Sequence, residues 1–421
     1  MKKLLVLVIA LVAALTVTAC QKKEETLVIF QNKIEIDSVL RTYATAWGEA
    51  NGVDVEVKSC GGDTCAYGTQ ILAEFQSAKQ PDIFVIEGMG GYKVYEEKVL
   101  AFKGDEAWIS DTELEFKVED KVYGFPVAVE GWGMAYNKTI LEAAFAHEGN
   151  GRTIDSLKNV SQAEYVEVFA AIQAYYTANN MNDYAVVSMA AGSGMTWVTG
   201  LHNFNGYLSA GLSYSDSTVI DKLNDGIVDD ARLTQLANWV EILYNNADQT
   251  ILNTGGYDEQ VGKFATGKAA FLHQGNWTDS SYTNSTFEMG YLPHAVLTEG
   301  NDSIFIGAPS YYVINKDSKN VSAAKAFLED LAASSEGHDY MVNKANMVPA
   351  FNSVTLTPAT PLSAAVMAWN QSGKAYAWWQ NDMPSGFGMN TLGPIYGNFA
   401  NGTITKAQFI AQVKAEIQKL A

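Results

Sequence analysis

The sequence predicts an α/β fold with a largely parallel sheet. From residue 26 onward, short buried-strand patterns alternate with amphipathic helical patterns, which is typical of βαβ units. With 421 residues, of which 48% are hydrophobic, the chain is long enough to build two lobes with their own cores. No Pro- or Ser-rich linker divides it, so two lobes would have to be joined by crossing strands rather than by a tether.

The N-terminal part of the globular chain shows this alternation most clearly. The predicted elements are a strand at 26–31, a helix at 38–52, a strand at 53–59, a helix at 67–80 and a strand at 81–88. Ligands on parallel sheets bind at the carboxyl ends of strands. A candidate site is therefore expected where these strands end, at 30–32, 60–62 and 86–88.

The later elements follow the same rules of periodicity. The predicted elements are an extended segment at 121–137, a helix-rich region at about 138–250, strands in "AAFLHQ" and "FEMGYLP", an extended segment at 307–317, a helix at 320–334 and a terminal helix at 405–420.

The N-terminus indicates export. Lys2 and Lys3 precede an unbroken apolar run, Leu4–Val17, as in a secretory signal peptide. The run ends in "VTAC", which resembles a bacterial lipobox, so we expect residues 1–19 to be removed and Cys20 to carry lipid. Residues 20–25 would then form a short tether. The protein would be held on the outer side of the cytoplasmic membrane, or lie in the periplasm. The alternative is a plain signal peptide that happens to contain Cys20.

The net charge of the chain excludes some classes of binding partner. The formal net charge is −19, which repels phosphate backbones and anionic lipid headgroups. Nucleic acid is therefore not an expected partner. We expect contact with a membrane through the lipid anchor only.

The stretch "GKFATGKA" (262–269) comes close to a phosphate-binding loop. Ala269 stands where that motif needs a hydroxyl for Mg²⁺, and the expected order here is helix, turn at Gly267, then strand. A nucleotide site needs the opposite order, so none is predicted and no cofactor is expected.

Cysteine and histidine residues give little evidence of catalysis or metal binding. Cys60 and Cys65 flank a Gly-containing loop, where either a local disulfide or a metal pair without evident further ligands is possible. The five histidines are scattered along the chain, and no nucleophile-elbow motif is present. No metal site is predicted.

Four segments together carry a family resemblance: "PDIFVIEGMGGY", "YGFPVAVEGWGMAYNK", "FATGKAAFLHQGNW" and "VINKDSKNVSAAKAFLEDLA". In this order they resemble the extracytoplasmic solute-binding lipoproteins of ABC importers, in the carbohydrate-binding family that includes maltose-binding protein. The resemblance covers nearly the whole mature chain.

The resemblance implies the two-lobed periplasmic-binding-protein fold (type II), with a hinge of crossover strands that lets the lobes close on a ligand. Crossovers are expected near 127–130, 307–310 and 348. Lobe one would comprise residues 26–128 and 309–347, and lobe two would comprise residues 129–308 and 348–421.

The resemblance also implies the ligand-binding residues. Carboxylates and amides would bond sugar hydroxyls, and aromatic rings would cover the apolar face of a sugar ring. The matching positions are Gln31, Asn32, Glu87, Glu130, Asn276 and Trp277. The alternatives are a surface or salt-bridged role for the two acids and core packing for Trp277.

Other aromatic residues are weaker candidates. Trp132 and Tyr311 could equally pack the hinge. The family pattern has a further acid in lobe two that is missing here, which leaves Trp197 in "MAAGSGMTW". A late stacking tryptophan is also missing from its usual place, and Trp378 and Trp379 stand upstream of it.

The expected function is capture of a carbohydrate, in particular an oligosaccharide, and its delivery to permease subunits by a monomeric binding protein that is not an enzyme. Two alternatives stay open. One is a binding protein for a non-sugar solute, since aromatic cages also suit quaternary amines. The other is a glycosidase that uses Glu87 and Glu130 as its two carboxylates.

Overall fold

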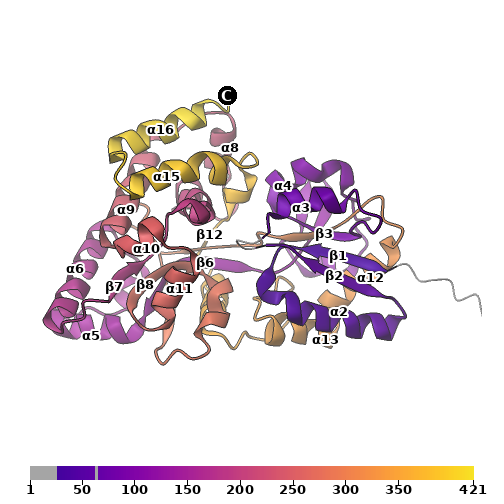
Figure 1. Ribbon diagram of the computed structural model, residues 1–421, viewed down its shortest axis with the longest axis horizontal. Coiled ribbons are helices and arrows are strands. Elements are labelled where there is room, and N and C mark those ends of the chain that lie inside the picture. Colours follow the sequence, from indigo (N-terminus) through magenta and orange to yellow (C-terminus); the bar gives the residue numbers. More distant parts are fainter. Residues whose placement is uncertain (1–25, 62–64) are drawn as a thin grey trace, which may run out of the picture.

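The computed structural model describes residues 26–61 and 65–421. The predicted signal sequence, the tether and Cys20 lie outside these residues. The described chain forms two lobes, each built around its own β-sheet with helices on both sides (Figure 1). Across the described residues, no helix combines the length and the apolar character needed to cross a bilayer.

The first lobe contains a six-stranded sheet in the order β2-β1-β3-β11-β5-β4. Its strands are β1 (Leu27–Gln31), β2 (Val55–Ser59), β3 (Ile83–Ile86), β4 (Phe116–Val118), β5 (Lys121–Pro126) and β11 (Tyr311–Ile314). β1 runs parallel to β2 and β3, as predicted. β11 is antiparallel to both β3 and β5, so the sheet is mixed rather than largely parallel. The prediction fails there because β11 returns from the other lobe and enters in the reverse direction.

Both faces of the sheet are buried at β1 and β3, which explains the apolar runs of these two strands. Ile29 of β1 packs into the core beneath α2 and α12, whereas the next residue, Phe30, packs on the opposite face with α3. The helices of this lobe are α2 (Asp37–Asn51), α3 (Tyr67–Glu74), α4 (Gly88–Tyr95), α12 (Val321–Ala333) and α13 (Ser335–Asp339). α3 ends earlier than predicted because its chain turns before Pro81, where the Ser77 hydroxyl donates to the Lys79 carbonyl (2.7 Å).

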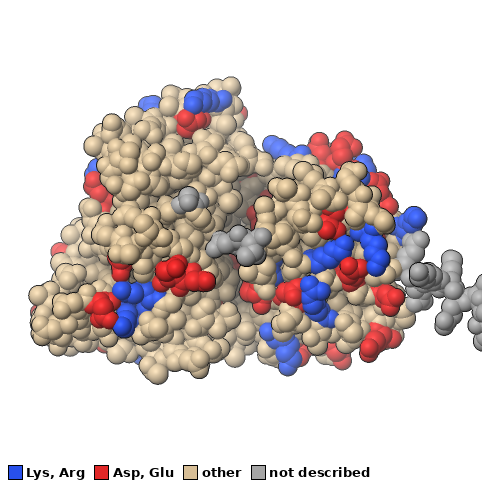
Figure 2. All heavy atoms as spheres, viewed as in Figure 1, with Lys and Arg blue, Asp and Glu red and all other residues tan. Residues whose placement is uncertain are grey.

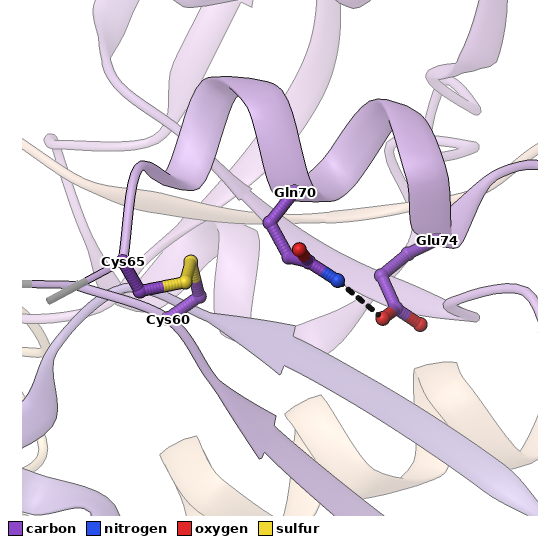
Figure 3. The surroundings of a disulfide bond; sticks show 4 residues. All are labelled: Cys60, Cys65, Gln70 and Glu74. Atoms are coloured by element: carbon purple, nitrogen blue, oxygen red, sulfur yellow. Dashed lines mark hydrogen bonds between the residues drawn. A yellow bond between two sulfur atoms is a disulfide. The ribbon is translucent and has the colours of Figure 1, made fainter.

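A disulfide joins the end of β2 to the start of α3 (Figure 3). Cys60 follows β2, and its N–H donates to the carbonyl of Gln31 at the end of β1 (2.9 Å). Cys65 lies just before α3 and is bonded to Cys60. The bridge therefore closes a loop at the carboxyl ends of the two strands.

The second lobe is built around the long strand β6. Its strands are β6 (Glu130–Asn137), β7 (Ala185–Ser188), β8 (Ala269–Gly275), β9 (Met289–Leu292), β10 (Ile304–Gly307) and β12 (Ala375–Tyr376). β6 is antiparallel to β8, β9 and β10. The order is β12-β10-β6-β8-β7, and β9 pairs with β6 off this path.

Helices cover this sheet and make up most of the second lobe (Figure 1). They are α5 (Lys138–Glu148), α6 (Gln162–Ala178), α7 (Phe204–Ser209), α8 (Thr218–Asn224), α9 (Asp230–Asn246), α10 (Gln249–Thr254), α11 (Tyr257–Ala265), α14 (Pro361–Gln371), α15 (Gly393–Ala400) and α16 (Lys406–Gln418). Gly267, with φ +72°, makes the turn from α11 into β8, which confirms the predicted helix–turn–strand order.

The chain passes between the two sheets at three places. It leaves the first sheet after β5 and enters the second at β6, and it returns between β10 and β11. It crosses a third time between α13 of the first lobe and α14 of the second. The N–H of Val127 donates to the Ser310 carbonyl (3.0 Å), and that of Val129 donates to the Val348 carbonyl (2.9 Å), so the three crossing segments bond to one another. The lobe boundaries at 128/129, 308/309 and 347/348 stay a prediction.

Candidate functional site

The molecular surface is hollowed between the two lobes (Figure 2). A small cavity of about 60 Å³ lies at the hinge end of this cleft. Its lining comes from both lobes and from the crossing segment between β5 and β6. The residues that line it are Lys33, Glu35, Ile36, Ala128, Val129, Glu130, Asn276, Trp277, Asp279, Ser280, Lys344, Ala345, Asn346 and Met347.

The side of the cleft formed by the first lobe carries polar and charged groups at strand ends. We call Asn32, Lys33, Glu35 and Glu87 the polar wall. Asn32 follows β1 and Glu87 follows β3, two neighbouring parallel strands, so their side chains meet: Asn32 Nδ2 donates to Glu87 Oε1 (2.8 Å). This contact follows from the predicted strand ends.

Gln31 supports this wall from inside. Its side chain is fully buried. Its Nε2 donates to Ser59 Oγ (2.5 Å) and to the Lys33 carbonyl (2.8 Å), while its Oε1 accepts from the Lys33 N–H (2.6 Å). Gln31 therefore shapes the turn that presents Asn32 and Lys33, and its side chain does not face the cleft as the sequence had suggested.

Glu87 combines access to solvent with partial desolvation. Its side chain is exposed, yet burial by the surrounding protein raises its pKa, against the opposing effects of the Lys33 ammonium and the Asn32 hydrogen bond. A carboxylate that is both accessible to water and surrounded by protein atoms lies in a concave part of the surface. Such a group has lost part of its hydration and is ready to accept hydrogen bonds from a ligand.

An ion pair connects the polar wall to the other lobe. The Lys33 ammonium bonds to Glu130, the first residue of β6, and lies 3.8 Å from a Glu35 oxygen. Burial acts to lower the pKa of Lys33, but the carboxylates of Glu130 and Glu35 outweigh it and raise that pKa. Lys33 is therefore charged, and Glu130 is already paired across the cleft.

The side formed by the second lobe is aromatic. We call Trp197, His202, Trp277 and Trp379 the aromatic wall. Trp277 is half-buried, and its ring centroid lies 6.2 Å from that of Trp197 and 6.3 Å from that of Trp378. Its Nε1 donates to Gln274 Oε1 (3.0 Å). Trp197 and Trp379 are half-buried too, so three indoles keep accessible surface.

A glycine makes room for Trp277. Its indole folds back over Gly275, the last residue of β8, where a Cβ atom would collide with the ring. The adjacent Asn276 fixes this turn, since its Oδ1 accepts from the Gly131 N–H (2.9 Å) and its Nδ2 donates to Ser363 Oγ (3.1 Å). Asn276 is buried by these contacts, although it also lines the hinge cavity.

Two of the predicted tryptophans lie beneath the surface. Trp132 is 1% exposed and stacks on Phe305 of β10, with ring centroids 4.1 Å apart. Trp378 is 9% exposed and packs against Gly307. Both therefore support the aromatic wall from behind. Trp132 is in the core of the second lobe, whereas the sequence had suggested a place in the cleft or in the hinge.

A second region where the lobes meet brings together residues that sequence reasoning missed. Tyr311 is half-buried at the start of β11, and its pKa is raised by burial and by the neighbouring Tyr214 and Asp382. Asp382, in the short helix Trp379–Asp382, accepts a hydrogen bond from the N–H of Met89 in α4 (3.3 Å), so the lobes touch there. Neither Tyr214 nor Asp382 belongs to a recognisable motif; only their place after folding marks them.

No cluster suited to a metal was found: within residues 26–61 and 65–421, no group of three His, Cys, Asp or Glu side chains could hold an ion. The arrangement instead offers hydrogen-bond acceptors and a cation on one side, and aromatic faces on the other. Such a cleft can enclose a ligand that has both apolar faces and hydroxyl groups.

Comparisons with known proteins agree with this architecture. The model of the bacterial extracellular solute-binding protein family matches residues 42–372. A maltooligosaccharide ABC transporter solute-binding lipoprotein of Streptococcus pneumoniae (strain TIGR4) is 23% identical over 369 residues, which cover 83% of this chain and 81% of that protein.

Solved structures share the fold. A chitin oligosaccharide binding protein matches with a TM-score of 0.70 and 20% identity, over 94% of this chain and 98% of that one. The solute-binding protein RafE in complex with raffinose also has a TM-score of 0.70, with 16% identity, over 94% and 99% of the two chains.

Proposed function

Because this chain belongs to the bacterial extracellular solute-binding protein family, we propose that it is the substrate-binding component of an ABC importer and captures a carbohydrate. The observation that carries the proposal is that the two walls meet at one cavity, which Lys33 and Glu35 of the polar wall and Trp277 of the aromatic wall line together. Relatives named for maltooligosaccharide, chitin oligosaccharide and raffinose support an oligosaccharide as the ligand.

The two walls suit the two surfaces of a sugar. A pyranose ring has an apolar face of C–H groups, which stacks on an indole, and a rim of hydroxyls, which bond strongly to carboxylates. In the proposed complex, Trp277 and Trp197 stack on sugar rings from the second lobe. Asn32 and Glu87 bond hydroxyls from the first lobe, and Trp379 and Tyr311 extend the cleft.

The remaining predicted residues have supporting roles in this proposal. Glu130 holds Lys33 in place and closes the hinge end. Gln31, Trp132, Asn276 and Trp378 fix the residues that touch the ligand. Since the acids of this cleft are committed to binding and to an ion pair, the proposed protein binds its sugar without chemical change and without a cofactor.

The cellular setting is part of the proposal. The chain would be exported, anchored through a lipid on Cys20, and would act as a monomer that hands its ligand to permease subunits. The names of the Streptococcus relatives, which include the word lipoprotein, support this setting. Replacing Cys20 with Ala should abolish lipid labelling and release the protein from membranes.

A sugar panel tests the function. Purified protein beginning after Cys20 is mixed with maltotriose, raffinose, stachyose and chitotriose, and the unfolding midpoint is recorded. A ligand that binds only the folded state raises this midpoint. We expect at least one sugar to do so and to be recovered unchanged. The proposal would be contradicted if no sugar in the panel shifted the midpoint. It would also be contradicted if a bound sugar were hydrolysed.

A further inference from the structure

His202 lies at the centre of the aromatic wall. Its ring is 5% exposed. The ring centroid is 5.2 Å from that of Trp277 and 5.3 Å from that of Trp197. It is also 5.3 Å from Trp132 and 5.7 Å from Trp378. One buried histidine therefore touches two of the three half-buried indoles, Trp197 and Trp277, and the two buried indoles behind them.

A π-helix brings His202 and Trp197 onto the same face. Trp197–Asn203 is a π-helical segment, in which residue i+5 lies over residue i. In an α-helix the same two residues would point roughly 140° apart, at about 100° per residue. Gly200 in this segment packs directly against Gly388 of a second π-helix, Phe387–Leu392, and a Cβ at either position would collide with the other segment. The close packing holds the segment in place.

His202 is supported from the sheet. Its ring is stacked on Trp132, with 19° between the planes, and Trp132 is stacked on Phe305 of β10, with 15° between the planes. Trp132 itself belongs to β6, the central strand. This stack connects His202 to the two central strands of the second lobe, while its edges contact the indoles of the cleft.

The ring is packed among other aromatic rings, and its buried nitrogen is not what holds it in place. Its Nδ1 is buried and has no hydrogen-bond partner among the described residues. The titratable group that faces it is His273 of β8, which is bonded in turn to His294 (Nδ1 to Nε2, 3.0 Å). Burial lowers the pKa of His202 and the neighbouring His273 lowers it further, so the ring is neutral.

We propose that His202 is a positioning residue: its ring, stacked on Trp132, holds Trp197 and Trp277 in the orientation that stacks on the ligand. The sugar part of this proposal rests on the proposed function, but the positioning itself exists in the free protein. Two variants of His202 distinguish the effect of a flat ring from the effect of side-chain volume alone. His202→Phe keeps a flat ring, and His202→Leu fills the site without one. Val198→Ala is the control, because Val198 is fully buried in the same π-helix and its replacement removes apolar volume without removing a ring.

The first readout needs no ligand. Protein labelled with 5-fluorotryptophan gives fluorine resonances for its nine tryptophans, assigned by single replacements. We expect His202→Leu to shift or broaden the resonances of Trp197 and Trp277, and His202→Phe and Val198→Ala to leave them nearly in place. Trp47 and Trp108, in the other lobe, should not move in any variant. The proposal is overturned if His202→Leu leaves Trp197 and Trp277 unchanged, or if all three variants move them equally.

The second readout is the affinity for the sugar that gives the largest thermal shift. His202→Leu should weaken it about tenfold or more, as expected when anchor aromatics are misplaced, and His202→Phe should restore it to within about threefold of the original. Val198→Ala should lower the unfolding midpoint with little change in affinity. If Val198→Ala lost as much affinity as His202→Leu, the role of His202 would be purely structural. If no sugar binds the unaltered protein, the proposed function fails, and the fluorine spectra alone decide on His202.

Discussion

The two walls of the cleft are built in different ways. The polar wall comes from residues that directly follow β1 and β3, so neighbouring strand ends place Asn32 beside Glu87. The aromatic wall is assembled from segments far apart in the chain, namely a π-helix, the end of β8 and the segment after β12. One wall follows from local sequence and strand order, and the other exists only after the second lobe has folded.

The walls should also contribute differently to binding. Charged groups such as Glu87 must give up water to bond a ligand, so their net contribution is modest. Indole faces offer large apolar area that is already partly desolvated by the surrounding rings. We therefore expect the aromatic wall to supply most of the affinity and the polar wall to supply most of the selectivity.

The largest effect is expected at Trp277. Replacing Trp277 with Ala removes a stacking plane, which should cost about 2 kcal/mol or more of binding free energy, or about thirtyfold in affinity. The matched control is Trp369→Ala, since Trp369 is a half-buried indole of the same lobe whose Nε1 bonds to the Tyr291 carbonyl. Calorimetric titration should show weak binding only for the first variant. If Trp277→Ala bound the sugar as tightly as Trp369→Ala, Trp277 would not be a ligand-binding residue.

A smaller effect is expected from moving the same indole without deleting it. In Gly275→Ala the new methyl group collides with the Trp277 ring, which must tilt away. Affinity should fall about tenfold, because a displaced ring no longer meets the ligand face. Gly262→Ala, at an open position on α11, is the control. Tryptophan fluorescence reports whether the Trp277 ring has moved in Gly275→Ala. If the ring has moved and the affinity for the sugar is unchanged, stacking on Trp277 does not contribute to binding.

Glu87 tests the polar wall. Glu87→Gln keeps the shape and loses the charge, so affinity should fall about fivefold at pH 7, less than for Trp277→Ala. Because burial raises the pKa of Glu87, acidification neutralises it earlier than an ordinary glutamate. Affinity of the unaltered protein should therefore fall as the pH is lowered through that pKa, and the Gln variant should show a flatter profile. Parallel pH profiles would contradict a ligand contact by Glu87.

The smallest effect concerns stability at the point where the lobes touch. Burial raises the pKa of Asp382 to about 6, so the folded state binds a proton more readily than the unfolded state, and stability falls as the pH rises through the interval up to 6. Asp382→Asn retains an acceptor for the Met89 N–H and removes the charge. It should raise the free energy of unfolding at pH 7 by about 1 kcal/mol, and denaturant titrations should show the difference vanishing at pH 4. A difference that persists at pH 4 would rule out the charge as its cause.

The polar wall shows how far sequence alone could reach. The strands and the helix α2 around it were predicted to within a few residues because their periodicity is local, whereas α3 ends at Glu74 and not at 80 as predicted. Asn32 and Glu87 follow strand ends. The mixed sheet was not predicted, because the direction of β11 depends on a chain crossing from the other lobe.

The aromatic wall shows the limit. Trp197 and Trp277 were named from their surroundings in the sequence, but nothing local distinguishes them from Trp132, which is buried. His202 was dismissed with the other scattered histidines, although folding brings it together with His273 and His294. Its role depends on a π-helix and on a contact between Gly200 and Gly388, two features that residue periodicity does not reveal.

The central claim is that both walls act on one ligand. Calorimetric titration of the best sugar from the panel into the unaltered protein, Glu87→Gln and Trp277→Ala tests it most directly. The account predicts saturable one-to-one binding that each variant weakens, Trp277→Ala more than Glu87→Gln, with both variants folded. Tight sugar binding that neither replacement changes would contradict it.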